Sequence, residues 1–322
     1  MTGNARTSLG GCGRRSVVTM DQRNDVRDFL TSRRGKISPE TAGLPAYGGN
    51  RRVSGLRREE VAMLAGVSVD YYTRLERGNL RGVSESVLDS LVRALQLDEA
   101  ETTYLFDLAR AANASPSTTK RASAQRVRPS IQRTLDSMTG APAWVRNGRF
   151  DFLAANRLGY ALYSEMFDDP IRPANNARFV FLDPRSKEFY IDWDRATYDI
   201  VAFLRSEAGR NPYDRALSDL VGELSTRSEL FRKLWAGHNV RFHRSGTKSL
   251  NHPVVGRLDL SFEAMELPVD PGLTLLTYNA EPGTASADGL TLLATWAATL
   301  DQNAHPVSAE LSDRSTVRRS GE

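Results

Sequence analysis

The chain has 322 residues, enough for two folded domains, and carries 43 Lys and Arg against 39 Asp and Glu. Its 40% apolar content is ordinary for a globular protein, and no apolar run approaches the roughly 20 residues that a membrane span needs. The single cysteine, Cys12, excludes a disulfide framework. Composition therefore predicts a cytoplasmic protein without a membrane partner.

Positive charge is concentrated near the N-terminus. From Arg14 to Arg58 there are eleven Lys or Arg against four Asp or Glu. A local excess of this kind attracts polyanions such as nucleic acid. A second basic stretch, from Lys120 to Arg133, is either a solvated linker or a further phosphate contact.

The periodicity of apolar residues predicts five short helices in the first third of the chain. Their expected ranges are 25–34, 57–65, 69–77, 85–95 and 98–112. They would form one all-α domain over residues 21–112. Residues 1–20 are small, basic and aperiodic and are predicted to be disordered, while residues 113–129 have the composition of a linker.

The pattern becomes mixed over residues 130–300. A hairpin is expected around Asn147-Gly148, from strands 143–147 and 150–155, and further strands are expected at 240–243, 257–266 and 273–278. Helical periods occur at 156–167, 193–208, 213–225, 229–235 and 286–300. We therefore expect a second, α+β domain with an antiparallel sheet, followed by a disordered tail at 301–322.

The most informative stretch runs from Leu56 to Gly78. Two helices that cross around a short turn need a small residue in the first helix, a glycine at the turn and apolar residues where the second helix packs. The residues that meet these needs are Ala62, Gly66, Val67, Tyr72 and Leu75. Ser68 is well placed to cap the second helix, and Gly78 to end it.

If the second helix enters the major groove of DNA, the outward residues near its start are base-reading candidates. These are Val69, Asp70, Thr73 and Arg74, and the helix N-terminus at Ser68 could face a phosphate. Arg74 suits a guanine edge, whereas Asp70 either stabilises the first turn or accepts from cytosine. The candidates for phosphate contact are Arg51, Arg52, Arg57, Arg58 and Arg77, with plain surface charge as the alternative for each.

The segment from Val67 to Gly78 resembles the helix-turn-helix of the XRE/Cro-like bacterial regulators. That resemblance implies a lambda-repressor-like domain, double-stranded DNA as partner, a place on the nucleoid and a homodimer on a palindromic site. The loop from Gly43 to Leu56, together with segments 179–184, 190–193 and 252–256, resembles regulators with an MmyB-like ligand-binding domain. This second resemblance implies a PAS-like C-terminal domain with a lipophilic pocket and a fatty-acid-like effector.

An enzyme is not expected, because the chain has no G-x-S-x-G, Walker, dinucleotide or H-E-x-x-H motif. No cofactor is expected either, and the four histidines lack the spacing of metal ligands. In the sensor interpretation, aromatic residues of the second domain line a ligand cavity: Trp144, Phe152, Phe179, Phe181, Phe242 and Phe262. In the alternative they fill the core, and the domain serves dimerisation or a protein interaction.

Overall fold

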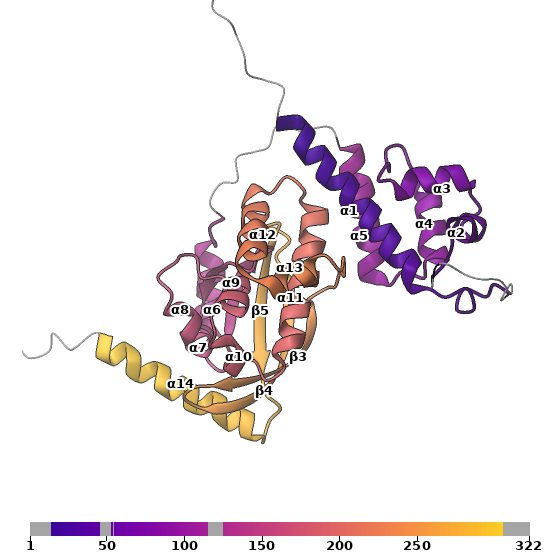
Figure 1. Ribbon diagram of the computed structural model, residues 1–322. Helices are drawn as coiled ribbons and strands as arrows, with labels where there is room; N and C mark the ends of the chain where they lie inside the picture. The colour runs from indigo at the N-terminus through magenta and orange to yellow at the C-terminus, as the bar shows by residue number, and fades with distance from the viewer. Residues whose placement is uncertain (1–13, 46–52, 54, 115–124, 305–322) are drawn as a thin grey trace, which may run out of the picture. The chain divides into compact units, whose positions relative to one another are not determined.

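The structure, a computed structural model, describes residues 14–45, 53, 55–114 and 125–304 (Figure 1). It divides into two compact units. Unit 1 combines the N-terminal region, up to Ala124, with residues 194–243, and unit 2 combines Gln125–Trp193 with the chain from Arg244 onward. In the described residues, no helix has the length and apolarity to cross a membrane.

In the described residues, the N-terminal part of unit 1 contains helices and no strand. Its helices are α1 (Arg14–Lys36), α2 (Arg58–Leu64), α3 (Val69–Glu76), α4 (Glu85–Ala94) and α5 (Glu99–Asn113). Ser84 and Asp98 cap α4 and α5 by accepting bonds from the third helical amide of each. The five predicted helices are thus confirmed.

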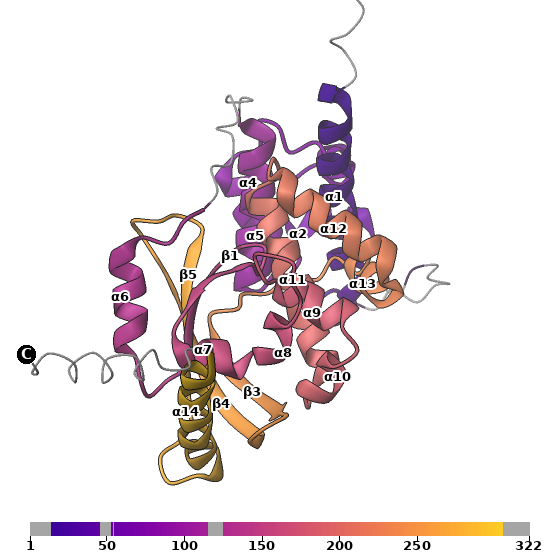
Figure 2. The same cartoon turned by 90° about the vertical axis from the view of Figure 1, so that its left-hand side faces the viewer.

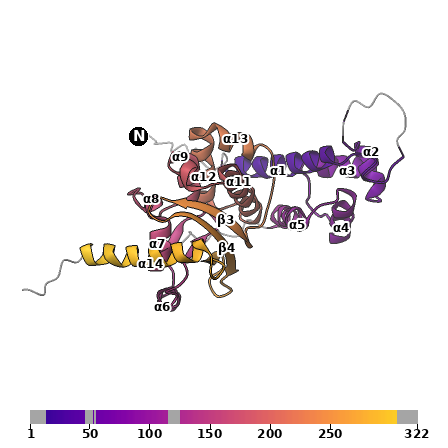
Figure 3. The ribbon, with the colours of Figure 1, turned by 90° about the horizontal axis from the view of Figure 1, so that it is seen from below.

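The first helix starts earlier than the sequence pattern indicated. Residues 1–20 were expected to be disordered, but α1 begins at Arg14 and runs as one long helix toward α2 and α3 (Figure 3). Its buried anchors, Val26, Phe29 and Leu30, lie in the second half. Extending a helix costs far less than nucleating one, so the anchored half supports turns that have no apolar period of their own.

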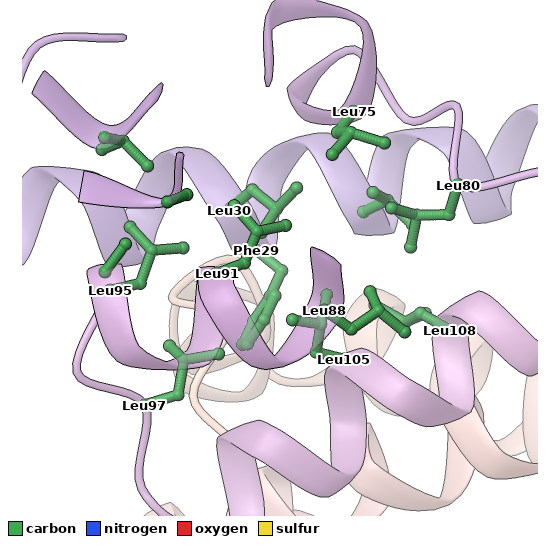
Figure 4. Packing of buried hydrophobic residues seen from close by; sticks show 14 of the residues in the cluster. Phe29, Leu30, Leu75, Leu80, Leu88, Leu91, Leu95, Leu97, Leu105 and Leu108 are labelled. Atoms are coloured by element: carbon green, nitrogen blue, oxygen red, sulfur yellow. The ribbon is translucent and has the colours of Figure 1, made fainter. Parts of the chain in front are cut away.

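A leucine-rich core holds unit 1 together. Phe29 and Leu30 of α1 meet leucines from the helices α3, α4 and α5, and the side chains interdigitate (Figure 4). Tyr72 and Leu75 of α3 are fully buried in this core. The apolar faces that the sequence pattern picked out are therefore the faces that pack.

The second part of unit 1 is a run of three helices, α11 (Trp193–Arg210), α12 (Arg215–Arg227) and α13 (Glu229–Trp235). They confirm the predicted helices at 193–208, 213–225 and 229–235. A strand expected at 240–243 is wrong, because these residues have no regular structure. Val240 belongs instead to the core that it shares with α1, α3, α4 and α5.

Unit 2 is built on an antiparallel sheet, in which β1, β5, β4 and β3 can be followed in Figure 2. In the described residues the sheet has five strands, in the order β2-β1-β5-β4-β3. The strands are β1 (Ala143–Asn147), β2 (Phe152–Ala155), β3 (Ser245–His252), β4 (Gly256–Glu266) and β5 (Leu273–Asn279). The β1–β2 hairpin around Asn147-Gly148 is confirmed, with Trp144 opposite Ala155. The strand β3 was not expected from the sequence.

The remaining helices of unit 2 are α6 (Pro129–Ser137), α7 (Arg157–Leu162), α8 (Ser164–Phe167), α9 (Asn176–Leu182), α10 (Ser186–Phe189) and α14 (Ala285–Ala304). The one helix expected at 156–167 is two, divided at Tyr163. The helix α14 runs through Ala304, so the tail expected to be disordered from 301 is helical over its first residues. Leu135 of α6 packs on Ala143 and Val145, whose side chains share one face of β1.

Candidate nucleic-acid interface and ligand site

The helix-turn-helix of unit 1 is set by local bonds. At the start of α2, the Arg57 amide donates to the Glu60 carboxylate at 2.7 Å. Between the helices, Gly66 adopts a φ of 65°, a left-handed conformation that costs glycine no strain. Ser68 then caps α3 by accepting from the Tyr71 amide at 3.1 Å. The predicted roles of Gly66 and Ser68 as turn glycine and cap are confirmed.

The predicted base-reading residues all lie on the outer side of α3. Val69 is 40% exposed, Asp70 and Arg74 are exposed, and Thr73 is half-buried. The guanidinium of Arg74 lies 4.7 Å from the centre of the Tyr71 ring. This cation–π contact orients Arg74 before any DNA arrives.

The predicted phosphate contacts differ in their surroundings. Arg57 and Arg77 are exposed, and within the described residues neither forms an ion pair. Arg58 is instead bound to Glu76, with 2.5 Å between its Nε and a carboxylate oxygen. Arg51 and Arg52 lie outside the described residues.

Glu76 organises a network that sequence reasoning missed. Its side chain is 1% exposed, and Arg34 of α1 donates two bonds to one oxygen while Arg58 of α2 donates to the other. Burial alone would raise the pKa of Glu76, but the bonds from Arg58 and Arg34 outweigh it and lower the pKa. A carboxylate at the end of α3 thus joins three helices.

Aromatic residues gather on one face of the sheet in unit 2. Trp144 stacks on Phe152 at 5.0 Å and meets Tyr278 edge-on at 4.8 Å, and Phe262 lies 5.8 Å from Tyr278. Phe179 joins the same cluster through other rings. The structure thus brings together four of the six predicted ligand residues.

The other two predicted residues are Phe181 and Phe242. Phe181 of α9 is half-buried. Phe242 is a correction, because it packs partly buried against the core of unit 1 and not in the cluster around Trp144. The apolar side chain of Phe242 does not by itself indicate in which of the two units the residue packs.

The aromatic cluster contains buried polar groups as well as rings. The hydroxyls of Tyr163 and Tyr278 are 3.1 Å apart, and Tyr190 donates to Asn176. Burial raises the pKa of Tyr190 to about 12, so its hydroxyl stays neutral. The Nε1 donor of Trp144 is buried without a hydrogen-bond partner among the described residues.

A separate pocket of about 470 Å³ lies between α7, α14 and the end of β5. Most of its lining is apolar, with Leu158, Leu290 and Ala294 among the side chains. The volume falls inside the range of about 300 to 1,000 Å³ that small-molecule sites occupy. None of the six predicted ligand residues lines this pocket.

Comparison with known families agrees with this geometry. A family model described as the MmyB-like transcription regulator ligand binding domain matches residues 127–293, more than half of the chain. The chain belongs to this MmyB-like family. A model described as a helix-turn-helix domain matches residues 49–105. No curated protein matches the chain.

This MmyB-like protein is therefore a DNA-binding transcription regulator with a ligand-binding domain. The helix-turn-helix match includes α2, α3 and α4 completely, and with them the exposed face of α3. The ligand-binding match includes the aromatic cluster, most of the pocket lining and also residues 194–243, which are compact with unit 1. Residues 194–243 thus lie inside the region that the ligand-binding family model matches, but they pack in unit 1 and not in unit 2.

Proposed function

We propose that the regulator reads a specific DNA sequence with α3 as a homodimer, and that a small lipophilic molecule bound to unit 2 changes its affinity for DNA. The observation that carries the DNA part is the capped, core-anchored α3 with Val69, Asp70 and Arg74 exposed on its outer side. Exposed side chains on a helix that can enter the major groove are what direct readout of base edges requires.

The DNA part is tested by selecting duplexes from a randomised library with the full chain. Enrichment of a palindrome whose half-sites lie about one helical turn, near 34 Å, apart is the expected result. Affinity for the selected duplex should fall steeply with salt, because phosphate contacts release counterions. A library that stays random after repeated rounds would contradict sequence-specific binding, and a single half-site would contradict the dimer.

The ligand part rests on apolar space in unit 2. The pocket beside Leu158 and Leu290 has a largely apolar lining, to which the described part of the chain contributes no charged side chain. The cluster around Trp144 is a second candidate, because the Nε1 donor of Trp144 is buried and has no acceptor among the residues that the structure describes. A ligand oxygen could supply one. The rings of this cluster are already in contact, so a ligand there has to displace one of them.

Native mass spectrometry of the purified full chain tests for a bound lipophile. Leu290→Trp fills the pocket, and Trp144→Phe keeps a ring but removes the donor. We expect Leu290→Trp to abolish binding and Trp144→Phe to preserve it. The reverse result moves the site to the aromatic cluster, and a protein that never carries or takes up a lipophile supports the dimerisation module instead.

A further inference from the structure

Residues 194–243 are held to the helix-turn-helix domain by a buried arginine of α11. The Arg205 side chain is 2% exposed, and its Nη1 lies 2.8 Å from an Asp25 oxygen on α1. Its Nη2 donates to the Trp235 carbonyl, and the guanidinium lies 3.8 Å from the centre of a Trp235 ring. Arg205 therefore joins α1, α11 and the end of α13 at a single point.

A second buried arginine, which lies on α1, also binds residues 194–243 to the helix-turn-helix domain. Arg33 of α1 is 2% exposed, donates to the His238 carbonyl at 2.5 Å and pairs with Glu101 of α5 at 3.1 Å. Near it, Lys36 of α1 donates to the Asn239 side chain at 2.9 Å. We call the contacts made by Arg205 and Arg33 the α1 junction.

The His238 ring lies among charges at the α1 junction. Its Nε2 is 3.6 Å from Asp28, and burial together with the cations Arg205, Arg33 and Arg27 lowers its pKa from 6.5 to about 4 although Asp28 opposes the shift. His238 is therefore neutral at neutral pH. The neutral ring therefore adds no positive charge beside the buried guanidinium groups of Arg205 and Arg33.

Apolar contacts also join residues 194–243 to the rest of unit 1. Gly209 of α11 lies so near α5 that a β-carbon there would come within 2.3 Å of the Tyr104 ring. Val240 is 7% exposed within the core of unit 1. The core of unit 1 thus includes Val240, which comes from the segment 194–243.

The helix α1 also contacts the recognition helix α3. Arg34, next to Arg33 in the chain, bonds to Glu76 at the end of α3, and Thr31 donates to the same carboxylate. Gly78, which follows α3, lies so close to the Arg23 backbone that a β-carbon would come within 2.3 Å of the Arg23 carbonyl oxygen. One helix therefore carries the α1 junction and the support of α3.

We propose that Arg205 and Arg33 are positioning residues for DNA binding, and that the ligand-binding region acts on α3 through the α1 junction and α1. Residues 194–243 are joined to unit 2 at both ends and are embedded in unit 1, so a change in their position reaches α1 directly. A rigid helix with contacts at both places couples them physically. This inference rests on the proposed function, in which ligand controls DNA affinity.

Amide hydrogen exchange of the full chain, without DNA, tests the proposal. Arg205→Met removes one of the two buried arginine charges of the α1 junction but keeps an unbranched aliphatic side chain. It should speed exchange in α3 by about 2- to 30-fold, the range that couplings between packed residues cover. The matched control is Arg215→Met on α12, an exposed arginine 3.9 Å from Asp219, which should leave α3 unchanged.

Two further variants keep the test decisive. Asp25→Asn removes the opposite charge from a residue that is one-third exposed, so it reports on the α1 junction even if Arg205→Met unfolds. Arg205→Lys, which retains a cation, should restore part of the protection of α3. Faster exchange in α11 and α13 with unchanged exchange in α3 would overturn the proposal, since the junction would then hold residues 194–243 and nothing else.

The same variants separate this inference from the proposed function. With a selected duplex, Arg205→Met and Asp25→Asn should weaken DNA binding in parallel with the faster exchange of α3. A chain that selects no duplex defeats the proposed function, while the exchange result still decides whether the α1 junction reaches α3.

Discussion

A glycine-to-alanine change at Gly209 should destabilise the protein, against the ordinary rule for helices. Alanine in place of a helix-interior glycine normally gains roughly 0.5 to 1 kcal/mol. At Gly209 the added methyl would lie 2.3 Å from the Tyr104 ring, which is buried and packed edge-on against Phe29 at 5.0 Å. Overpacking of this kind costs about 1 to 3 kcal/mol, so the clash outweighs the gain in propensity.

The matched control is Gly222 in α12, where a β-carbon meets nothing within 4 Å. Gly209 lies in the last turn of α11, so Gly209→Ala gains no more helix propensity than Gly222→Ala, and the clash should make Gly209→Ala the less stable variant by about 1 to 3 kcal/mol. Urea unfolding followed by circular dichroism measures this difference in stability, from the unfolding midpoints of two variants that have the same m-value. Gly209→Ala as stable as Gly222→Ala would refute the close packing of α11 on α5.

Three more predictions concern unit 1. Arg74→Ala should cost about 1 to 3 kcal/mol and relax the preference at one base pair, whereas Arg77→Ala should weaken binding to every duplex alike; equal losses for both on selected and random DNA would contradict this division. Because native His238 has a pKa of about 4 against 6.5 when unfolded, only the unfolded state binds the proton between these values, so stability falls as pH drops from about 6.5 to 4. In His238→Asn the urea midpoint should change less with pH between about 4 and 6.5. An unchanged pH dependence of the midpoint would rule out His238 as its origin. Glu76→Gln should cost about 3 kcal/mol in urea unfolding, because breaking a buried ion pair leaves charge uncompensated, while exposed Glu59→Gln should be neutral.

The elements that the sequence predicted well are those whose signals are local. Ser68 and Gly66 lie within a few residues of the groups they cap or turn, so the boundaries of α3 could be placed to within one residue. The strand β3 could not be found in this way, because along Ser245–His252 only Leu250 and His252 are buried. It exists by pairing with β4, whose residues stand opposite it in regular register.

By itself the sequence determined the helix-turn-helix, the exposed face of α3, the two folded regions and the family resemblance, since these follow from residue spacing within short segments. Only the tertiary structure decided that residues 194–243 complete the DNA-binding unit, and that Arg58 pairs with Glu76. Arg205 and Asp25 are far apart in the chain, and nothing in either neighbourhood specifies the other. The physical reason is that a buried charge takes as its partner whichever opposite charge the packing of the chain brings within reach, and packing depends on the whole core.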